Sequence, residues 1–288
     1  MTAVRAGGVM PGEPVLLTDD TAGVRTLTLN RPRRKNAIDH ELWLTLADAL
    51  RHSATDRSVR AVVITGAGGA FCSGADISAP DNSHPVYRMR ELTDVALLLH
   101  ELPVPTVAKV RGVAVGAGWN LALGCDLVVA SPQARFSQIF AQRGLSLDLG
   151  GSWLLPKLVG LQQAKRLALL AETIDAAHAR ELGLVTWVVP DDEIDTYVSD
   201  LAARLASGPP IALAQTKALL NAGAGRTLRE ALAGEAAAQG LNFATADAPE
   251  AFAAFAEKRE AQFTGRWTVH RPAMRGRDDS ENTRGADV

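Results

Sequence analysis

Two glycine-rich turns contain backbone groups that could donate hydrogen bonds to a ligand oxygen. The first turn runs from Gly66 to Asp76, after the apolar segment AVVIT, and the second runs from Gly112 to Gly118, shortly after Val110. Glycine lets a backbone approach a ligand closely, and the N–H groups at a helix start have no partner within the helix. The two turns could form a pair of donors. They could equally be tight connections between strands and helices.

Neither turn has the sequence of a nucleotide-binding loop. A phosphate-binding P-loop needs Gly-Lys-Ser/Thr at its end, and a dinucleotide fold needs GxGxxG with an acidic residue about twenty positions later. Both patterns are missing around the two turns. Nucleotide binding by either of those folds is therefore not expected.

The elements around the turns alternate between strand and helix up to about residue 190. β-Branched and apolar residues predict strands over 15–18, 24–30, 61–65 and 106–110. Asp39 is expected to cap a helix that runs to about residue 52, and Pro103 and Pro105 to end a second helix over 88–102. This order predicts an α/β fold with a mostly parallel sheet and right-handed crossovers.

Strand patterns almost disappear after residue 191, where the sequence becomes rich in alanine. Helices are predicted over 194–206, 210–222, 227–245 and 249–263. We therefore expect four regions: a flexible leader (1–13), an α/β core (14–205), a small helical lobe (206–266) and a disordered tail (267–288).

Composition and charge exclude several classes of protein. The 288 residues are 47% hydrophobic, and 30 Lys and Arg nearly balance 32 Asp and Glu, so neither disorder nor a nucleic-acid or membrane-surface partner is expected. The longest apolar stretch, 112–130, is interrupted by Asn120 and Asp126, which disfavours a membrane span. Cys72 and Cys125 lack a CxxC or a nearby His, so no metal site is expected. Buried thiols in a reducing cytoplasm are the simplest interpretation.

Five motifs, in order along the chain, resemble the enoyl-CoA hydratase/isomerase family, the crotonases. They are LNRP with KNA (29–37), FCSGADI (71–77), RGVAVGAG (111–118), CDL (125–127), and IDAA with GLV (174–185), followed by the similar ending FAEKR (255–259). The resemblance implies a spiral of ββα units with a C-terminal helical lobe for oligomerisation. It also implies a homotrimer or a dimer of trimers, and an acyl-CoA thioester substrate. Coenzyme A would then be part of the substrate, with no cofactor bound permanently.

The resemblance assigns the two oxyanion-binding amides of the family to the backbone N–H groups of Ala75 and Ala117. Removing a proton beside a thioester carbonyl places negative charge on the carbonyl oxygen, and fixed N–H donors in a dry site stabilise that enolate. Loss of one such donor is expected to lower the rate by on the order of 10²–10³.

The acid/base residues depart from the pattern of the hydratases in this family. Their two glutamates correspond, counted without gaps, to Asn120 and Phe140, and neither side chain can act as an acid or base. Instead, Asp148 lies two residues before Gly150-Gly151 in a stretch similar to that of epoxyphenylacetyl-CoA isomerases and some enoyl-CoA isomerases, where this aspartate is the acid/base. The alternative is that Asp148 caps a helix starting near Gly150.

One carboxylate can take a proton from one carbon and return it to another, so the resemblance favours double-bond isomerisation of an enoyl-CoA in fatty-acid or aromatic acyl-CoA metabolism. Two alternatives stay open: an enoyl-CoA hydratase of β-oxidation, and a non-catalytic acyl-CoA binder. The catalytic groups would be Asp148, Ala75 and Ala117. The predicted substrate-binding residues are Lys35, Ala37, Ala75, Asp76, Ile77, Ser78, Ala117, Asn120, Phe140, Trp153 and Lys258.

Overall fold

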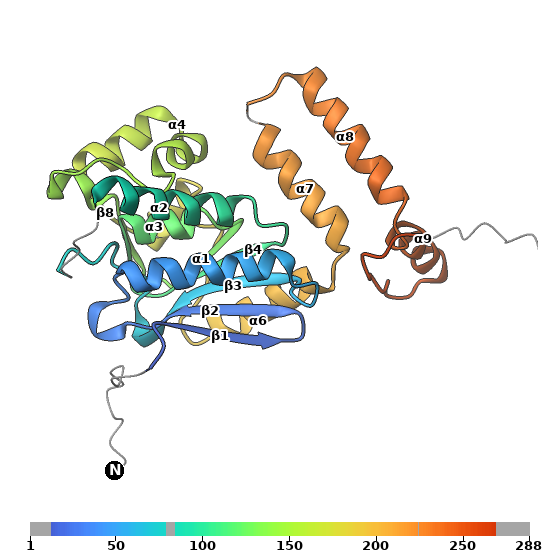
Figure 1. Cartoon of the computed structure of the whole chain (residues 1–288), viewed down its shortest axis with the longest axis horizontal. Helices are drawn as coiled ribbons and strands as arrows, with labels where there is room; N and C mark the ends of the chain where they lie inside the picture. Colours follow the sequence, from blue (N-terminus) through green and yellow to red (C-terminus); the bar gives the residue numbers. More distant parts are fainter. Residues whose placement is uncertain (1–12, 79–83, 224, 269–288) are drawn as a thin grey trace, which may run out of the picture.

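A computed structural model describes residues 13–78, 84–223 and 225–268, and its centre is a six-stranded sheet (Figure 1). Strand β1 pairs antiparallel with β2, and every later pairing in this sheet is parallel. The strands, in spatial order, are β1 (Leu16–Thr21), β2 (Val24–Leu29), β3 (Ala61–Gly66), β4 (Thr106–Val110), β6 (Leu127–Ala130) and β9 (Trp187–Val188). The predicted α/β fold with a mostly parallel sheet is confirmed.

A second, smaller sheet has the order β5 (Val113–Val115), β7 (Arg135–Ser137) and β8 (Thr173–Asp175). Its first two strands are parallel and the last pair is antiparallel. Only Arg111 and Gly112 separate β4 from β5, so the chain passes from the large sheet to the small one at the second glycine-rich turn.

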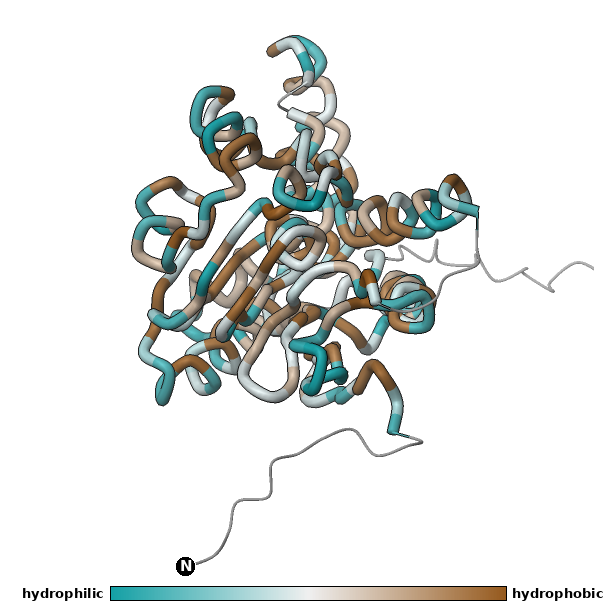
Figure 2. Tube along the Cα trace, turned by 90° about the vertical axis from the view of Figure 1, so that its left-hand side faces the viewer, coloured by the Kyte–Doolittle hydropathy of each residue, from teal (hydrophilic) through white to brown (hydrophobic). Residues whose placement is uncertain are grey.

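Helices cover both faces of the large sheet. On one face, α1 (His40–Thr55) packs against α2 (Pro85–His100), and on the other lies α6 (Ile194–Ser207) (Figure 1). Strand β3 contributes side chains to the hydrophobic packing on both faces of the sheet. Val62 and Ile64 belong to the core under α1, whereas Val63 packs with residues of α6, as the alternation of side chains along a strand requires. Figure 2 shows hydrophobic residues along the central strands and hydrophilic ones around them.

The remaining helices of the core are short or interrupted: α3 (Ala117–Leu123), α4 (Gly151–Leu170) and α5 (Ala176–Glu181). Helix α4 contains Pro156 and a non-helical Gly160, and its first turn lies next to α3. Cys72 and Cys125 are buried, as expected, and burial raises the pKa of each thiol to about 12. Both therefore stay protonated at neutral pH.

Several helix boundaries differ from the sequence-based ones. The Asp39 cap is confirmed, with its Oδ1 accepting from the Leu42 N–H at 3.0 Å. Helix α2, however, begins at Pro85 rather than at residue 88, because proline fits the first helical position. The helix predicted over 249–263 is wrong at its end. Helix α9 (Asp247–Glu257) stops where Lys258 adopts φ 55°, and Arg259 then pairs back with Glu250.

Helices α7 (Pro210–Gly223), α8 (Leu228–Phe243) and α9 extend away from the sheets as a lobe (Figure 1). Polar contacts attach α7 to the core. Lys217 Nζ lies 2.8 Å from Asp126 and donates to the Val104 carbonyl at 3.2 Å, and Asn221 donates to the His100 carbonyl at 3.0 Å. The predicted leader and tail lie, apart from Glu13, Trp267 and Thr268, outside the described residues.

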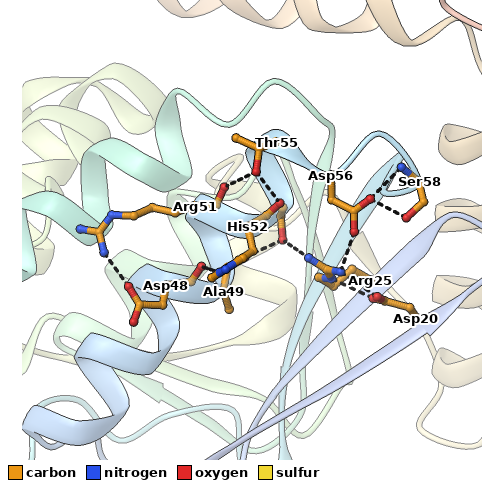
Figure 3. A network of polar contacts seen from close by, with 10 residues as sticks. Asp20, Arg25, Asp48, Ala49, Arg51, His52, Thr55, Asp56 and Ser58 are labelled. Carbon is orange, nitrogen blue, oxygen red and sulfur yellow. Dashed lines mark hydrogen bonds and ion pairs between the residues drawn. The ribbon is translucent and has the colours of Figure 1, made fainter.

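A buried arginine ties the edge hairpin to the end of α1 (Figure 3). Arg25 on β2 makes two hydrogen bonds to Asp20 of β1, at 2.8 and 2.7 Å, and a third to Asp56 at 3.1 Å. Hydrogen bonding to Arg25 lowers the pKa of Asp20. This network is structural and lies apart from the two glycine-rich turns.

Candidate active site

The two glycine-rich turns lie side by side because a short parallel ladder joins them. The Cys72 N–H donates to the Val113 carbonyl at 2.9 Å, and the Val115 N–H donates to the Cys72 carbonyl at 2.9 Å. On its other side the first turn pairs with the segment before α1. There the Ile38 N–H donates to Gly74, and the Asp76 N–H donates to Ile38, each at 2.8 Å. The backbone around Ala75 is thus fixed from both sides.

Glycine is required where the turns touch. Gly116 has φ 56° and ψ −126°, a conformation that residues with a Cβ rarely adopt, and it turns the chain from β5 into α3. A Cβ on Gly118 would lie 2.7 Å from Cys72 Sγ, and one on Gly74 would lie 3.0 Å from the Val115 carbonyl. The glycine pattern of the sequence therefore reflects close backbone packing at these positions.

The amides of Ala75 and Ala117 are the two predicted donors. Ala117 is the first residue of α3, and within the described part of the chain neither amide has a hydrogen-bond acceptor. A Cβ built on Gly74 would lie 3.9 Å from the Ala117 nitrogen, so the first turn reaches the second amide. The structure thus brings these distant segments together with two unused N–H groups.

Asp148 lines the same pocket as Ala75. This pocket, of about 890 Å³, lies between the start of α1, the first half of α2 and the loop that contains Asp148. The Asp148 Oδ1 atom is buried without a hydrogen-bond partner in the described structure. Burial raises the pKa of this carboxyl to about 6, although a hydrogen bond from the Asn120 amide lowers it. A carboxyl with this pKa can both accept and donate a proton near neutral pH.

The capping role considered for Asp148 is wrong. The residue before α4 is Gly150, with φ 79°, and no side chain caps this helix. Asp148 contributes only its backbone carbonyl, which accepts from the Gly151 N–H at 2.8 Å and from Asn120 Nδ2 at 2.9 Å. Its carboxyl group is therefore not used in capping.

Asn120 and Gln138 hold the Asp148 loop in place. Asn120 is 1% exposed, and its Oδ1 accepts from Gln138 Nε2 at 2.8 Å while its Nδ2 donates to Asp148. A Cβ on Gly151 would lie 2.5 Å from Asn120 Nδ2, so the start of α4 needs glycine here. Sequence analysis missed Gln138, because a single buried glutamine has no sequence pattern that distinguishes it from a surface one.

Some of the predicted substrate-binding residues lie where the segment before α1 pairs with the first turn. The Ser73 N–H of the first turn donates to the Lys35 carbonyl at 3.0 Å. Ile38, which follows Ala37, pairs with Ala75. Asp76 accepts from the backbone and hydroxyl of Ser78, which are the main cause of its low pKa, about 2, followed by Arg31.

Arg31 is a second residue that sequence analysis missed. Its guanidinium contacts the Ala37 carbonyl and lies 2.9 Å from both Asp76 and Asp39. It therefore joins the segment before α1 to the first glycine-rich turn. The motif LNRP contained this residue, but a sequence motif does not show which backbone atoms an arginine reaches.

Asn120, Phe140, Trp153 and Lys258 do not line the pocket of Asp148. Phe140 is buried, and its ring would lie 3.6 Å from a Cβ on Gly116, so it packs behind the second turn. Trp153 lines a separate apolar cavity, which it shares with Asn120. Lys258 follows α9 in the projecting lobe and lines neither the pocket of Asp148 nor the cavity of Trp153. Ile77 lines the pocket of Asp148, and its side chain is 77% exposed.

The described residues contain neither a metal-binding cluster nor a helix able to span a membrane. Across residues 13–78, 84–223 and 225–268, no group of three His, Cys, Asp or Glu side chains is arranged to hold a metal ion. In the same ranges no helix combines the length and the apolar character that crossing a bilayer requires.

Comparison with known proteins agrees with this fold. The model of the family described as Enoyl-CoA hydratase/isomerase matches residues 19–266. The chain is 38% identical over 260 residues to the 1,2-epoxyphenylacetyl-CoA isomerase of Escherichia coli K12, an alignment that covers 87% of this chain and 98% of that protein. The protein therefore belongs to the enoyl-CoA hydratase/isomerase family and is an acyl-CoA enzyme.

Relatives named for a different reaction are similarly close. A Rhodobacter capsulatus protein named "Probable enoyl-CoA hydratase" is 40% identical over 247 residues, covering 85% of this chain and 95% of that one. The crystal structure of an enoyl-CoA hydratase from Mycobacterium smegmatis superposes with a TM-score of 0.82 at 35% identity, covering 87% of this chain and 99% of that one. The crotonase fold is confirmed, and the names of the relatives divide between isomerase and hydratase.

Proposed function

We propose that this acyl-CoA enzyme is an enoyl-CoA double-bond isomerase with Asp148 as its acid/base. One observation carries the proposal: Asp148 has a buried, unpaired carboxylate oxygen in the pocket that Ala75 also lines. The other carboxylates that line this pocket are less suited. Asp39 and Asp76 are bound to Arg31, and Glu41 is exposed.

In the proposed reaction a 3-enoyl-CoA places its thioester oxygen at the amides of Ala75 and Ala117. The ionised Asp148 takes a proton from C2, and the electrons of the broken C–H bond delocalise over the double bond and the carbonyl. The two N–H groups stabilise the charge on the thioester oxygen. Protonated Asp148 then gives its proton to C4, and the double bond moves to C2–C3, so no cofactor is needed.

Hydration fits the side chains of this site less well. Addition of water needs one group to activate the water and another to deliver a proton to C2, and the second of these is not available at Asn120 or Phe140. Among the relatives, the Escherichia coli protein is named an isomerase of an epoxyphenylacetyl-CoA, which supports isomerisation as the class of reaction. A hydratase and a non-catalytic binder are the two outcomes that would contradict it.

The assay uses the purified protein with 3-enoyl-CoA and, separately, with 2-enoyl-CoA, both in D₂O. Migration of the double bond, with deuterium appearing at C2 or C4, is the expected result. Loss of the conjugated absorbance of 2-enoyl-CoA without bond migration would instead identify a hydratase. Tight binding without turnover or deuterium uptake would identify a binder.

A positioning role for Gln138 follows from its contact with Asn120. We expect Gln138→Met to lower kcat about tenfold with little change in KM, because the Asp148 loop loses part of its support. The pH profile of kcat should shift as well, which a purely structural defect would not cause. The matched control is Gln142→Met, which removes a hydrogen bond from Gln142 Nε2 to the Ala171 carbonyl. Equal effects of the two variants would contradict the role.

For the oligomeric state we propose a homotrimer or a dimer of trimers, and the projecting lobe supports self-association. Its helices expose large apolar side chains, for example Leu220, Phe243 and Phe255, which need a partner surface. A neighbouring subunit could then bring Lys258 to the predicted substrate-binding residues of this one. Light scattering should give a mass of three or six chains, and a monomer would contradict the assembly. The two buried thiols fit a reducing cytoplasm.

A further inference from the structure

A second cavity lies directly behind Asp148. It has a volume of about 320 Å³, and its walls are mostly apolar side chains from α2, α3 and the start of α4. Leu149 and Gly150, the residues that follow Asp148, line this inner cavity, whereas Asp148 itself lines the outer pocket. The chain around Asp148 therefore separates the pocket of the reacting carbonyl from the inner cavity.

One face of α3 runs from the proposed oxyanion amide of Ala117 toward this cavity. Ala117 supplies the proposed oxyanion amide, and Asn120, Leu121 and Gly124 line the inner cavity. These four positions are spaced i, i+3, i+4 and i+7, so they lie on the same side of the helix. An acyl chain that extends from a thioester at Ala117 would follow this face past Asp148.

An aromatic pair borders the inner cavity. The rings of His100 and Trp153 meet edge to face, with centroids 5.1 Å apart, and Lys157 Nζ lies 4.4 Å from the Trp153 centroid. Beyond them is a third cavity of about 500 Å³, which extends under α7. His100, Gly124, Trp153 and Leu154 line both cavities, so the pair forms the wall between them.

We infer that Trp153 limits the length of the acyl group that this enzyme accepts. The inference rests on the proposed acyl-CoA chemistry. An acyl group of medium length or an aryl group ends at the indole ring, whereas a long chain must pass it. Removing the ring would join the inner cavity to the one under α7 and give a long chain an apolar path.

Binding of saturated acyl-CoAs tests this wall without depending on turnover. Titration calorimetry with butanoyl-, octanoyl- and hexadecanoyl-CoA is expected to show that the unmodified protein prefers the octanoyl group. In Trp153→Ala the affinity for hexadecanoyl-CoA relative to octanoyl-CoA should rise by about tenfold or more, the range that a few methylene contacts produce. Butanoyl-CoA should bind both proteins alike, which shows that the variant is folded.

Two further variants make the result specific. Leu161→Ala, a 59% exposed position on the same helix outside both cavities, should leave the ratio unchanged. Ala96→Leu, which narrows the inner cavity from α2, should weaken octanoyl-CoA binding and spare butanoyl-CoA. An unchanged ratio in Trp153→Ala would overturn the inference alone. Failure of the unmodified protein to bind any acyl-CoA would overturn the proposed function as well.

Discussion

Replacing Asp148 by asparagine should lower isomerase activity by about 10³-fold or more, since the reaction uses this carboxyl both to remove and to return the proton. The affinity for acyl-CoA should stay within a few-fold, because the amide keeps the shape of the side chain. Steady-state kinetics with 3-enoyl-CoA and calorimetry with the saturated analogue measure the two quantities. Asp200→Asn, an exposed position on α6, is the control.

The same substitution should make the folded protein more stable at pH 7. The pKa of Asp148 is raised to about 6 in the folded state, above the unfolded value near 3.9. The free energy of unfolding is therefore highest, as far as this group is concerned, below pH 4, and it falls as the pH rises through 6. Removing the ionisable group should recover on the order of 2–3 kcal/mol at pH 7 and little below pH 4. Urea denaturation at the two pH values measures the difference.

The activity of the unmodified enzyme should rise with pH through about 6 and then level off, as the base becomes ionised. A variant that is less stable than the unmodified protein at pH 7, or a rate independent of pH between 5 and 7, would show that Asp148 is not a desolvated base.

Replacing Ala117 by proline should lower kcat by about 10²–10³-fold, because proline has no N–H and so deletes one oxyanion donor. Ala117 is the first residue of α3, where proline fits the helix without loss of an intrahelical hydrogen bond. The Gly116 conformation before it, with ψ −126°, avoids the helical region that proline excludes. Circular dichroism and the melting temperature monitor the fold.

The control for this variant is Leu228→Pro, the equivalent first position of α8, which is 75% exposed. It makes the same backbone change in the lobe, away from both pockets, and should leave kcat within twofold. Full activity in Ala117→Pro would show that this amide does not bind the thioester oxygen.

Local patterns in the sequence were sufficient for much of the fold. The AVVIT run is strand β3, Asp39 caps α1, and residues 106–110 form β4, because each of these depends on periodicity or capping over a few residues. The end of α9 could not be predicted, since it depends on the pairing of Arg259 with Glu250 nine residues earlier. An uninterrupted alanine-rich pattern gives no sign of that contact.

The site was predicted in part for the same reason. The glycine spacing left open whether the two turns form a pair of donors or are only tight connections, and the structure joins them through Cys72 and Val113. By contrast, burial of the Asp148 carboxyl depends on how α3 and the start of α4 pack around it, with Gln138 behind Asn120. Such packing brings together residues from separate elements, and a single sequence does not show which elements pack against each other.

A crystal structure of the Asp148→Asn variant with bound 3-enoyl-CoA tests the central claim most directly. The account predicts the thioester oxygen at about 2.7–3.1 Å from the backbone nitrogens of both Ala75 and Ala117. The side chain at position 148 should face C2 and C4 of the acyl group, and the acyl end should lie in the inner cavity that Trp153 lines. A thioester oxygen away from either amide, or a side chain at 148 directed into solvent, would contradict it.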